Sequence, residues 1–324
     1  MSPLRVAVVS GRIGALDPVL AGAALGRGFS DHAQVAVVPL AEGGPDLASA
    51  VAALWDAEPD VGADRWTVRA PGRVLIGLRQ PDAPAWAPQA STVDLGEWVA
   101  AQVRPDDARI VLDLTGITAH DGGAGLLAAA GELLAGRDLI GIVAADELDL
   151  PATGIGGGLA RRAFAARLDI AELLAADAAL AERARGLGQG LELAPGGGAA
   201  GGCGLAVLAS GGRMVTGTQF CHVEAGLERT LGLADLVVTG CTELSALDRG
   251  GPVVTAVAQW AEQAQRPCVL VTGGAGLARR ELRTLGIEAA HLVPEDMPLD
   301  AALAAVAGRI VAGWVSGTSR PHLN

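Results

Sequence analysis

The sequence contains no lysine and no tyrosine, and few of its residues are aromatic. Only 3% of the 324 residues are aromatic, and because lysine is missing, all 24 residues counted as Lys or Arg are arginine. The absence of lysine excludes a P-loop lysine, a Schiff-base lysine, a kinase-type lysine and a Tyr/Lys reductase pair. Any phosphate clamp in this protein must therefore use arginine, backbone N–H groups or a metal ion.

Cysteine and long apolar runs are also scarce. The cysteines are widely spaced, and no C-x-x-C pair occurs among them: Cys203, Cys221, Cys241 and Cys268. This spacing predicts buried free thiols and argues against a zinc site or a disulfide framework. The N-terminus does not read as a signal peptide, and no apolar run of about 18 residues suggests a membrane span. We therefore expect a cytoplasmic protein without a membrane partner.

The charge of the chain limits its partners. The formal net charge is −12, and the isoelectric point is about 4.8. An acidic protein is a poor partner for nucleic acid or for an anionic membrane. A small anionic substrate remains compatible with this charge, because a local site can oppose the overall field. Hydrophobic residues make up 50% of the chain, and its length indicates either two domains or one large α/β domain.

Short apolar runs alternate with stretches of helical periodicity. Strands are predicted at residues 5–10, 35–40, 110–115, 139–145, 234–240 and 268–274. This β–α alternation is typical of a doubly wound parallel sheet, in which ligands bind at the carboxyl ends of the strands. Residues 66–69 and 73–78 break the rhythm around the turn A-P-G and predict an antiparallel hairpin. The hairpin indicates a second subdomain inserted into the first.

A glycine cluster between residues 194 and 212 has two interpretations. It reads A-P-G-G-G-A-A-G-G-C-G and leads directly into an apolar run. A helix that begins after such a loop offers unpaired N–H groups and a positive dipole end to an anion. Alternatively, the loop is a tight packing turn between small-residue helices.

A second glycine pair follows an aspartate at a predicted strand-to-helix junction. Asp121 precedes Gly122 and Gly123. An aspartate in this position either binds a metal ion or caps the N-terminus of the following helix. Its neighbour His120 is interpreted as a structural hydrogen-bonding group.

The order of these loops resembles that of the bacterial glycerate kinase family, which phosphorylates D-glycerate with ATP. Four stretches carry the resemblance: V-P-L-A-E-G-G at 38–44, H-D-G-G-A-G at 120–125, P-G-G-G-A-A-G-G-C-G at 195–204 and D-L-V-V-T-G at 235–240. The family's corresponding motifs are V-P-x-A-D-G-G, N-D-G-G-A-G, P-G-A-G-A-A-G-G-M-G and the strand before G-E-G-R-x-D. The resemblance covers nearly the whole chain.

The resemblance implies a two-domain α/β fold with the active site in the cleft between the domains. The flavodoxin-like domain, a doubly wound parallel sheet, would comprise residues 1–58 and 228–324, with 96–134. The second, inserted α/β domain would comprise 59–95 and 135–227. ATP, Mg²⁺ and a glycerate-like substrate are the implied ligands, with a role in organic acid metabolism. The sequence leaves homo-oligomerisation open.

Several polar positions of the family motifs are replaced in this chain. Residues 10–14, S-G-R-I-G, stand where the family has P-D-S-x-K, so Arg12 is the candidate to neutralise charge. Glu42 stands for an aspartate, while Asp121 is retained. Glu42 and Asp121 are therefore predicted to hold Mg²⁺ or to act as the base. The predicted substrate- and phosphate-binding glycines are Gly43, Gly44, Gly122, Gly123, Gly196, Gly197, Gly198, Gly201, Gly202 and Gly240.

These replacements leave a second hypothesis open. A catalytically inactive member of the family could bind a small acid or a nucleotide as a sensor or a partner subunit. A dinucleotide-dependent oxidoreductase is disfavoured, because no G-x-G-x-x-G follows the first strand in the expected βαβ unit.

Overall fold

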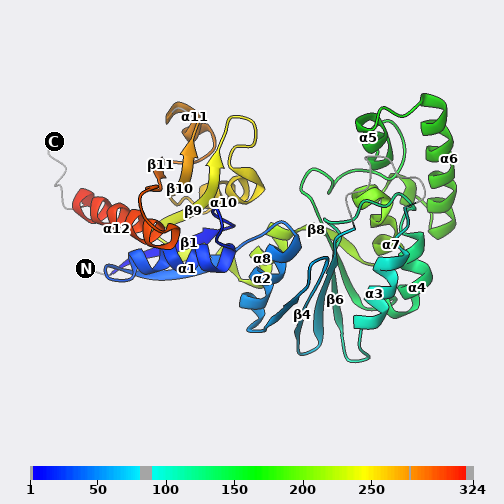
Figure 1. Cartoon of the computed structure of the whole chain (residues 1–324), viewed down its shortest axis with the longest axis horizontal. Coiled ribbons are helices and arrows are strands. Elements are labelled where there is room, and N and C mark those ends of the chain that lie inside the picture. The colour runs from blue at the N-terminus through cyan, green and yellow to red at the C-terminus, as the bar shows by residue number, and fades with distance from the viewer. Residues whose placement is uncertain (1–2, 81–89, 277–278, 319–324) are drawn as a thin grey trace. The chain divides into compact units, whose positions relative to one another are not determined.

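The chain folds into two compact units. The computed structural model describes residues 3–80, 90–276 and 279–318. Unit 1 consists of Met1–Ala41 and Cys221–Asn324, and unit 2 consists of Glu42–Phe220. Unit 2 is thus a continuous insertion into unit 1, and each unit contains its own sheet covered by helices (Figure 1). The expected two-domain α/β fold with an inserted second domain is confirmed.

Unit 1 is built on a five-stranded parallel sheet. Its strands are β1 (Leu4–Ser10), β2 (Ala33–Pro39), β9 (Leu236–Leu244), β10 (Cys268–Ala275) and β11 (Ala289–Leu292). The order across the sheet is β11-β10-β9-β1-β2. Counted in chain order within the unit, this is the flavodoxin-like order 2-1-3-4-5. The direction of winding therefore reverses between β1 and β9.

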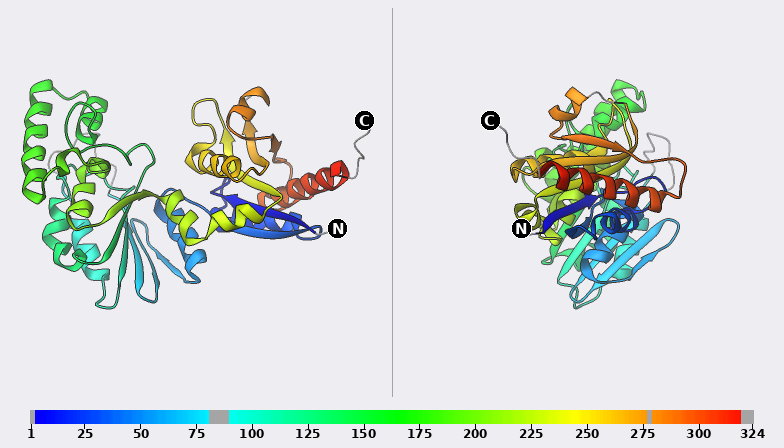
Figure 2. Two further views of the ribbon diagram at one scale, coloured as in Figure 1. Left: turned by 180° about the vertical axis from the view of Figure 1, so that it is seen from behind. Right: turned by 90° about the vertical axis from the view of Figure 1, so that its left-hand side faces the viewer.

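Helices cover both faces of this sheet. Successive residues of a strand point to opposite faces, and in these strands both sets of residues are apolar. The helices are α1 (Pro18–Phe29), α9 (Leu227–Leu233), α10 (Gly251–Gln263), α11 (Arg279–Thr284) and α12 (Leu299–Thr318). Val269 and Val271 of β10 pack with α1 and α12, which lie side by side in Figure 2, whereas Leu270 packs on the opposite face with α10. This alternation is what a doubly wound sheet requires.

Unit 2 contains a mixed six-stranded sheet. Its strands are β3 (Pro59–Val61), β4 (Arg65–Ala70), β5 (Arg73–Leu78), β6 (Arg109–Asp113), β7 (Asp138–Val143) and β8 (Arg213–Thr216). The strands follow chain order across the sheet. The pairs β3–β4 and β4–β5 are antiparallel, so the predicted hairpin is confirmed, and the pairs from β5 to β8 are parallel.

The helices of unit 2 separate into three groups. Helices α3 (Val93–Gln102), α4 (Ala124–Leu134) and α7 (Gly204–Ala209) bury one face of the sheet. Helix α2 (Gly44–Trp55) packs on β3, β4 and β5. Helices α5 (Gly158–Ala165) and α6 (Ile170–Leu187) form a smaller cluster centred on Leu159, Leu180 and Leu205. Helix α8 (Gly217–Glu224) leads back to unit 1.

The observed boundaries correct the expected ones. Residues 96–134 belong to unit 2, because they contain β6, which pairs with β5 and β7. Residues 42–58 also belong to unit 2, because α2 packs on β3 and β4. Residues 221–227 belong to unit 1.

Two further expectations concern thiols and membranes. All four cysteines are buried and free, as their spacing predicted. Among the helices in the described parts of the chain, none is both long and apolar enough to cross a membrane.

Candidate functional site

A cavity of about 450 Å³ lies within unit 2, at the edge where its parallel strands end. The start of α2 contributes Glu42, Gly43 and Gly44 to its wall. The segments after β5, β6 and β7 and the start of β4 supply the remaining lining residues: Arg79, Gln80, Thr115, Gly116, Thr118, Ala144 and Trp66. Ligands of α/β sheets bind at this edge. The cavity is therefore the candidate functional site of unit 2.

Asp113, the last residue of β6, holds the start of α2 in place. Its side chain is fully buried. Its Oδ2 accepts hydrogen bonds from Gly44 N at 2.6 Å and Trp66 Nε1 at 3.2 Å, and its Oδ1 accepts from Thr115 Oγ1 at 2.7 Å. Burial raises the pKa of Asp113, and these hydrogen bonds oppose that rise. Sequence analysis missed this residue, although a carboxylate that ends a buried strand was the available signal.

Close contact explains why glycine stands at position 43. A Cβ at Gly43 would lie 2.0 Å from Thr115 Oγ1. Gly43 therefore lets the start of α2 approach the loop after β6. The backbone of Gly44 has φ +71°, a conformation that favours glycine.

Glu42 is the half-buried carboxylate of the cavity. Burial raises its pKa, and the neighbouring negative charge of Asp146, which follows β7, raises it further. Asp146 is exposed and forms an ion pair with Arg161 Nη2. Glu42, Gly43 and Gly44 line this cavity together. Their role in binding substrate stays a prediction.

Asp121 lies in a different place from Glu42. It lines a smaller cavity of about 170 Å³ beside α6. Its carboxylate accepts hydrogen bonds from Ser91 Oγ, Thr92 N, Thr92 Oγ1, Gly123 N and Gly125 N, at 2.8 to 3.1 Å. Burial raises the pKa of Asp121, but these hydrogen bonds outweigh that effect and leave the pKa below its ordinary value. The geometry is that of a cap shared by the starts of α3 and α4.

The structure does not bring the two predicted metal ligands together. Glu42 and Asp121 line separate cavities, because Asp121 is turned toward the helix starts. Within the described ranges, no three His, Cys, Asp or Glu side chains are grouped closely enough to hold a metal ion by themselves. The carboxylate whose charge acts on Glu42 is that of Asp146, which is not one of the residues lining the cavity.

His120 precedes this cap. Burial, and then the positive charge of Arg162, lowers its pKa to about 4, while Asp121 opposes that shift. His120 is therefore neutral near pH 7, and it lines the same small cavity as Asp121.

The glycine loop before α7 is buried and tightly packed. All the predicted anion-binding glycines of this loop are buried: Gly196, Gly197, Gly198, Gly201 and Gly202. A Cβ at Gly198 would lie 2.1 Å from Pro151 O, and one at Gly201 would lie 1.7 Å from Ala119 O. The carboxylate of Glu147 accepts a hydrogen bond from Ala200 N at 2.8 Å. The anion at this loop is thus a side chain of the protein, and the contacts favour the packing interpretation.

Comparisons with known proteins agree with this architecture. Residues 160–313 match the profile of the Glycerate kinase family. The crystal structure described as a "putative glycerate kinase 2" from Salmonella typhimurium LT2 superposes with a TM-score of 0.78 at 18% identity, covering 98% of this chain and 100% of that one. Residues 160–313 thus resemble the glycerate kinase family in sequence, and the chain as a whole shares the fold of the Salmonella typhimurium protein.

Two sequence relatives are mycobacterial proteins. Uncharacterised proteins of Mycobacterium bovis and Mycobacterium tuberculosis are each 34% identical to it over 227 residues. Each match spans 67% of this chain and 59% of the relative. The matched region is thus less than two thirds of each relative's length.

The remaining predicted residues lie in unit 1. Arg12 is exposed in the loop after β1, and its Nη1 donates to Ala15 O at 3.4 Å. Gly14 N in the same loop donates to Thr242 Oγ1 at 2.8 Å, which joins the ends of β1 and β9 at the switch point. Gly240 lies inside β9, where a Cβ would be 2.3 Å from Ile13. Its role is to make space for Ile13.

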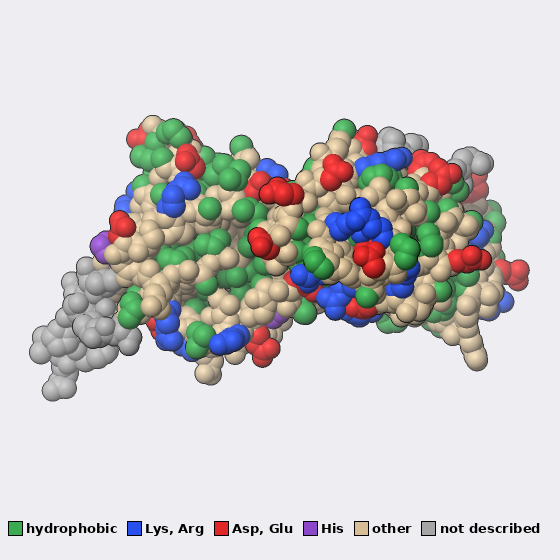
Figure 3. Space-filling view, turned by 90° about the horizontal axis from the view of Figure 1, so that it is seen from below, with side chains coloured by type: hydrophobic (Ala, Val, Ile, Leu, Met, Phe, Trp, Pro, Cys, Tyr) green, Lys and Arg blue, Asp and Glu red, His purple; other side chains and the backbone are tan. Residues whose placement is uncertain are grey.

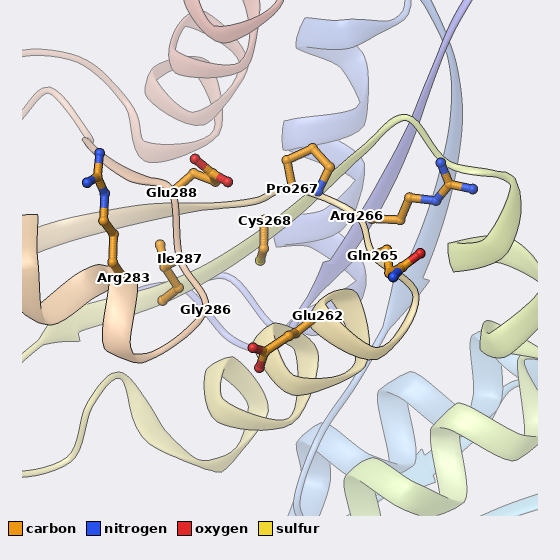
Figure 4. Close-up of a pocket in the computed structure, with 9 residues that line it drawn as sticks. All are labelled: Glu262, Gln265, Arg266, Pro267, Cys268, Arg283, Gly286, Ile287 and Glu288. Atoms are coloured by element: carbon orange, nitrogen blue, oxygen red, sulfur yellow. The ribbon is translucent and has the colours of Figure 1, made fainter.

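Unit 1 also has a larger cavity, of about 630 Å³, at the opposite edge of its sheet. It surrounds the amino ends of β10 and β11, with Cys268 at its centre (Figure 4). The guanidinium groups of Arg266 and Arg283 point in opposite directions away from Cys268. Burial raises the pKa of Cys268 to about 12, so its thiol stays protonated. These side chains do not converge on a ligand, and the cavity of unit 2 remains the stronger candidate.

Proposed function

We propose that the protein is a glycerate kinase-like phosphotransferase that transfers the γ-phosphoryl group of ATP to a hydroxyl of D-glycerate or a similar small hydroxy acid. The match of residues 160–313 to the Glycerate kinase family supports the reaction class. The observation that carries the proposal is the cavity of unit 2, which places a half-buried carboxylate, Glu42, at the carboxyl edge of a parallel sheet.

Glu42 is the proposed general base. An efficient base has a pKa near the working pH, and the raised pKa of Glu42 moves it in that direction. As the acceptor oxygen forms its bond to the γ-phosphorus and the bond to ADP breaks, the hydroxyl proton passes to the Glu42 carboxylate. Asp113 holds the start of α2, and so positions the backbone that carries Glu42.

Glu42 and Asp146 are the proposed holders of Mg²⁺. Mg²⁺ is usually bound by one or two carboxylates together with substrate phosphates. The negative charge of Asp146 raises the pKa of Glu42, so a cation held by both carboxylates would relieve that repulsion, with Asp146 exchanging its ion pair with Arg161 for the cation. When bound, Mg²⁺ neutralises charge on the transferring phosphoryl group.

The test is ADP formation by the purified protein with ATP, Mg²⁺ and D-glycerate, with calorimetric titrations of each ligand alongside. Turnover that requires both glycerate and Mg²⁺ would support the proposal. Binding of ATP or glycerate without turnover would instead support the inactive sensor or partner subunit. If neither turnover nor binding is found, this function is wrong.

A further inference from the structure

Arg79 is a cation that lines the cavity, and no described residue pairs with its charge. It directly follows β5 and is exposed. Within the parts of the chain that the structure describes, its guanidinium makes no hydrogen bond and no ion pair. Among the described residues that line the cavity, the one carboxylate is that of Glu42, and no ion pair joins it to Arg79.

Arginines at the opposite edge of the same sheet are neutralised. Figure 3 shows basic side chains gathered over unit 2 on the face seen from below. Near the amino ends of the strands, Arg69 pairs with the buried Asp107 at 2.7 Å, while Arg109 and Arg213 both pair with Asp138 at 2.6 Å. These ion pairs have a structural role, whereas Arg79 at the carboxyl edge is available to a ligand.

The backbone that carries Arg79 is fixed. Its N–H donates to Asp64 O at 2.8 Å, and Gln80 N donates to Gly116 O at 3.0 Å. The buried Gln80 side chain donates to Ser91 O at 2.8 Å and accepts from Thr118 N at 2.9 Å. A ligand that binds the guanidinium therefore does not have to order the backbone of residues 79 and 80 first, which favours affinity.

We infer that Arg79 binds the carboxylate of the acceptor substrate, and so selects hydroxy acids over neutral polyols. The inference rests on the proposed function for the identity of the acceptor. The cavity has one free cation, Arg79, among the described residues that line it, and a carboxylate at Glu42. An acid held by its carboxylate at Arg79 keeps that negative charge paired, while its hydroxyl is free to face Glu42. The planar guanidinium fork matches a carboxylate in two parallel hydrogen bonds.

The test compares Arg79→Ala, Arg79→Lys and Arg79→Gln with Arg185→Ala. Arg185 is an exposed arginine of α6 that lines neither cavity of unit 2. Calorimetric titration with D-glycerate and with glycerol measures binding without turnover, and steady-state kinetics measure the KM for each substrate. We expect Arg79→Ala to weaken D-glycerate binding by about 10- to 100-fold, the range for hydrogen bonds to a charged group. Glycerol binding and the KM for ATP should not change.

The substitutions separate charge from shape. Arg79→Lys keeps the charge without the fork, so we expect it to recover only part of the affinity. Arg79→Gln should behave as Arg79→Ala, and circular dichroism would verify that all variants fold. Arg185→Ala should match the wild type.

The outcomes distinguish this inference from the proposed function. Normal turnover by the wild type with an unchanged glycerate KM in Arg79→Ala would overturn the inference and leave the function intact. Arg79-dependent binding of D-glycerate without turnover would uphold the inference and reject the function. Failure of the wild type to bind D-glycerate would overturn the inference.

Discussion

Replacing Asp121 by alanine should loosen the starts of two helices at once. The Asp121 carboxylate accepts hydrogen bonds from three backbone N–H groups: Thr92 N at the start of α3, and Gly123 N and Gly125 N at the start of α4. Thr92 Oγ1 also donates to it and in turn accepts from Leu126 N at 3.0 Å. One side chain thus satisfies the orphan donors of both helices.

The magnitude follows from these contacts. A hydrogen bond to a charged group contributes about 1.5–3 kcal/mol, and loss of a helix cap costs about 0.5–2 kcal/mol. The site is only half-buried, so water would replace part of what is lost. We therefore expect Asp121→Ala to lower the local free energy of opening by about 2–4 kcal/mol, less than the sum of the separate hydrogen bonds.

Amide hydrogen exchange is the suitable assay, because a protein of two units need not unfold in one step. Exchange at residues 93–96 and 124–127 should accelerate by about 30- to 1,000-fold in Asp121→Ala where opening is at equilibrium. The control is Asp94→Ala, an exposed aspartate in the first turn of α3. Its loss removes only a favourable interaction with the helix dipole, worth about 0.3–1 kcal/mol.

The dependence on pH checks the charge of Asp121. Its pKa in the folded protein lies below the ordinary value. The stability that it contributes is therefore present above the unfolded pKa, about 3.9, and is lost as the pH falls through the folded pKa. The difference between wild type and Asp121→Ala should shrink in acid. Unchanged exchange at both helix starts in Asp121→Ala would refute the capping role.

Three further perturbations test the site and its frame. Glu42→Gln should reduce kcat by about 10²- to 10⁴-fold, the usual contribution of a general base. Because the pKa of Glu42 is raised, wild-type kcat should fall as the pH drops through a value above the ordinary glutamate pKa. For the same reason, Glu42→Gln should not lower the melting temperature at pH 8. The control is Glu58→Gln, at an exposed glutamate. Gly201→Ala should destabilise the protein by more than about 3 kcal/mol, because the new Cβ would lie 1.7 Å from a carbonyl oxygen. In the control, Gly211→Ala, the new Cβ meets no atom within 4 Å, so the cost should be about 1 kcal/mol for the positive φ alone. Urea denaturation of the two variants would show whether their stabilities differ. Burial raises the pKa of the Cys221 thiol to about 12, and the other three cysteines are also buried. The native protein should therefore react with a thiol reagent only as fast as it unfolds. A thiol that reacts faster would contradict this burial.

Sequence patterns identified most strands and helices, because apolar runs between glycine-rich loops are strong local signals. They did not identify all the strand partners. Residues 73–78 were predicted only as one arm of an antiparallel hairpin, yet β5 also pairs in parallel with β6, from Arg73↔Arg109 to Gly77↔Asp113. Pairing across such a separation depends on the whole sheet. For this reason the sequence did not place Arg79, which follows β5, at the edge where ligands bind.

The sequence could indicate which backbone segments reach the cavity, but not the direction of the side chains. Glu42, Gly43 and Gly44 line one cavity, and they are adjacent in sequence at the start of a helix. Asp121 was paired with Glu42 because both match carboxylates of the family motifs, but hydrogen bonding turns the Asp121 carboxylate toward α3 and α4. The carboxylate whose charge raises the pKa of Glu42 is instead that of Asp146. A sequence shows which carboxylates reach one edge of a sheet, and it does not show which donors capture them.

Different physical constraints act on the glycines and on the polar residues of this protein. Gly198 and Gly201 contact backbone carbonyl oxygens so closely that no side chain fits, whatever reaction the protein performs. A charged group at the rim of a cavity meets no such limit, since a cation can be supplied from another strand end. Arg79 is a cation of this kind, in a chain that has no lysine. Replaced motif residues beside retained glycines are therefore compatible with a rebuilt site, and the binding of D-glycerate to Arg79 variants decides whether it was rebuilt.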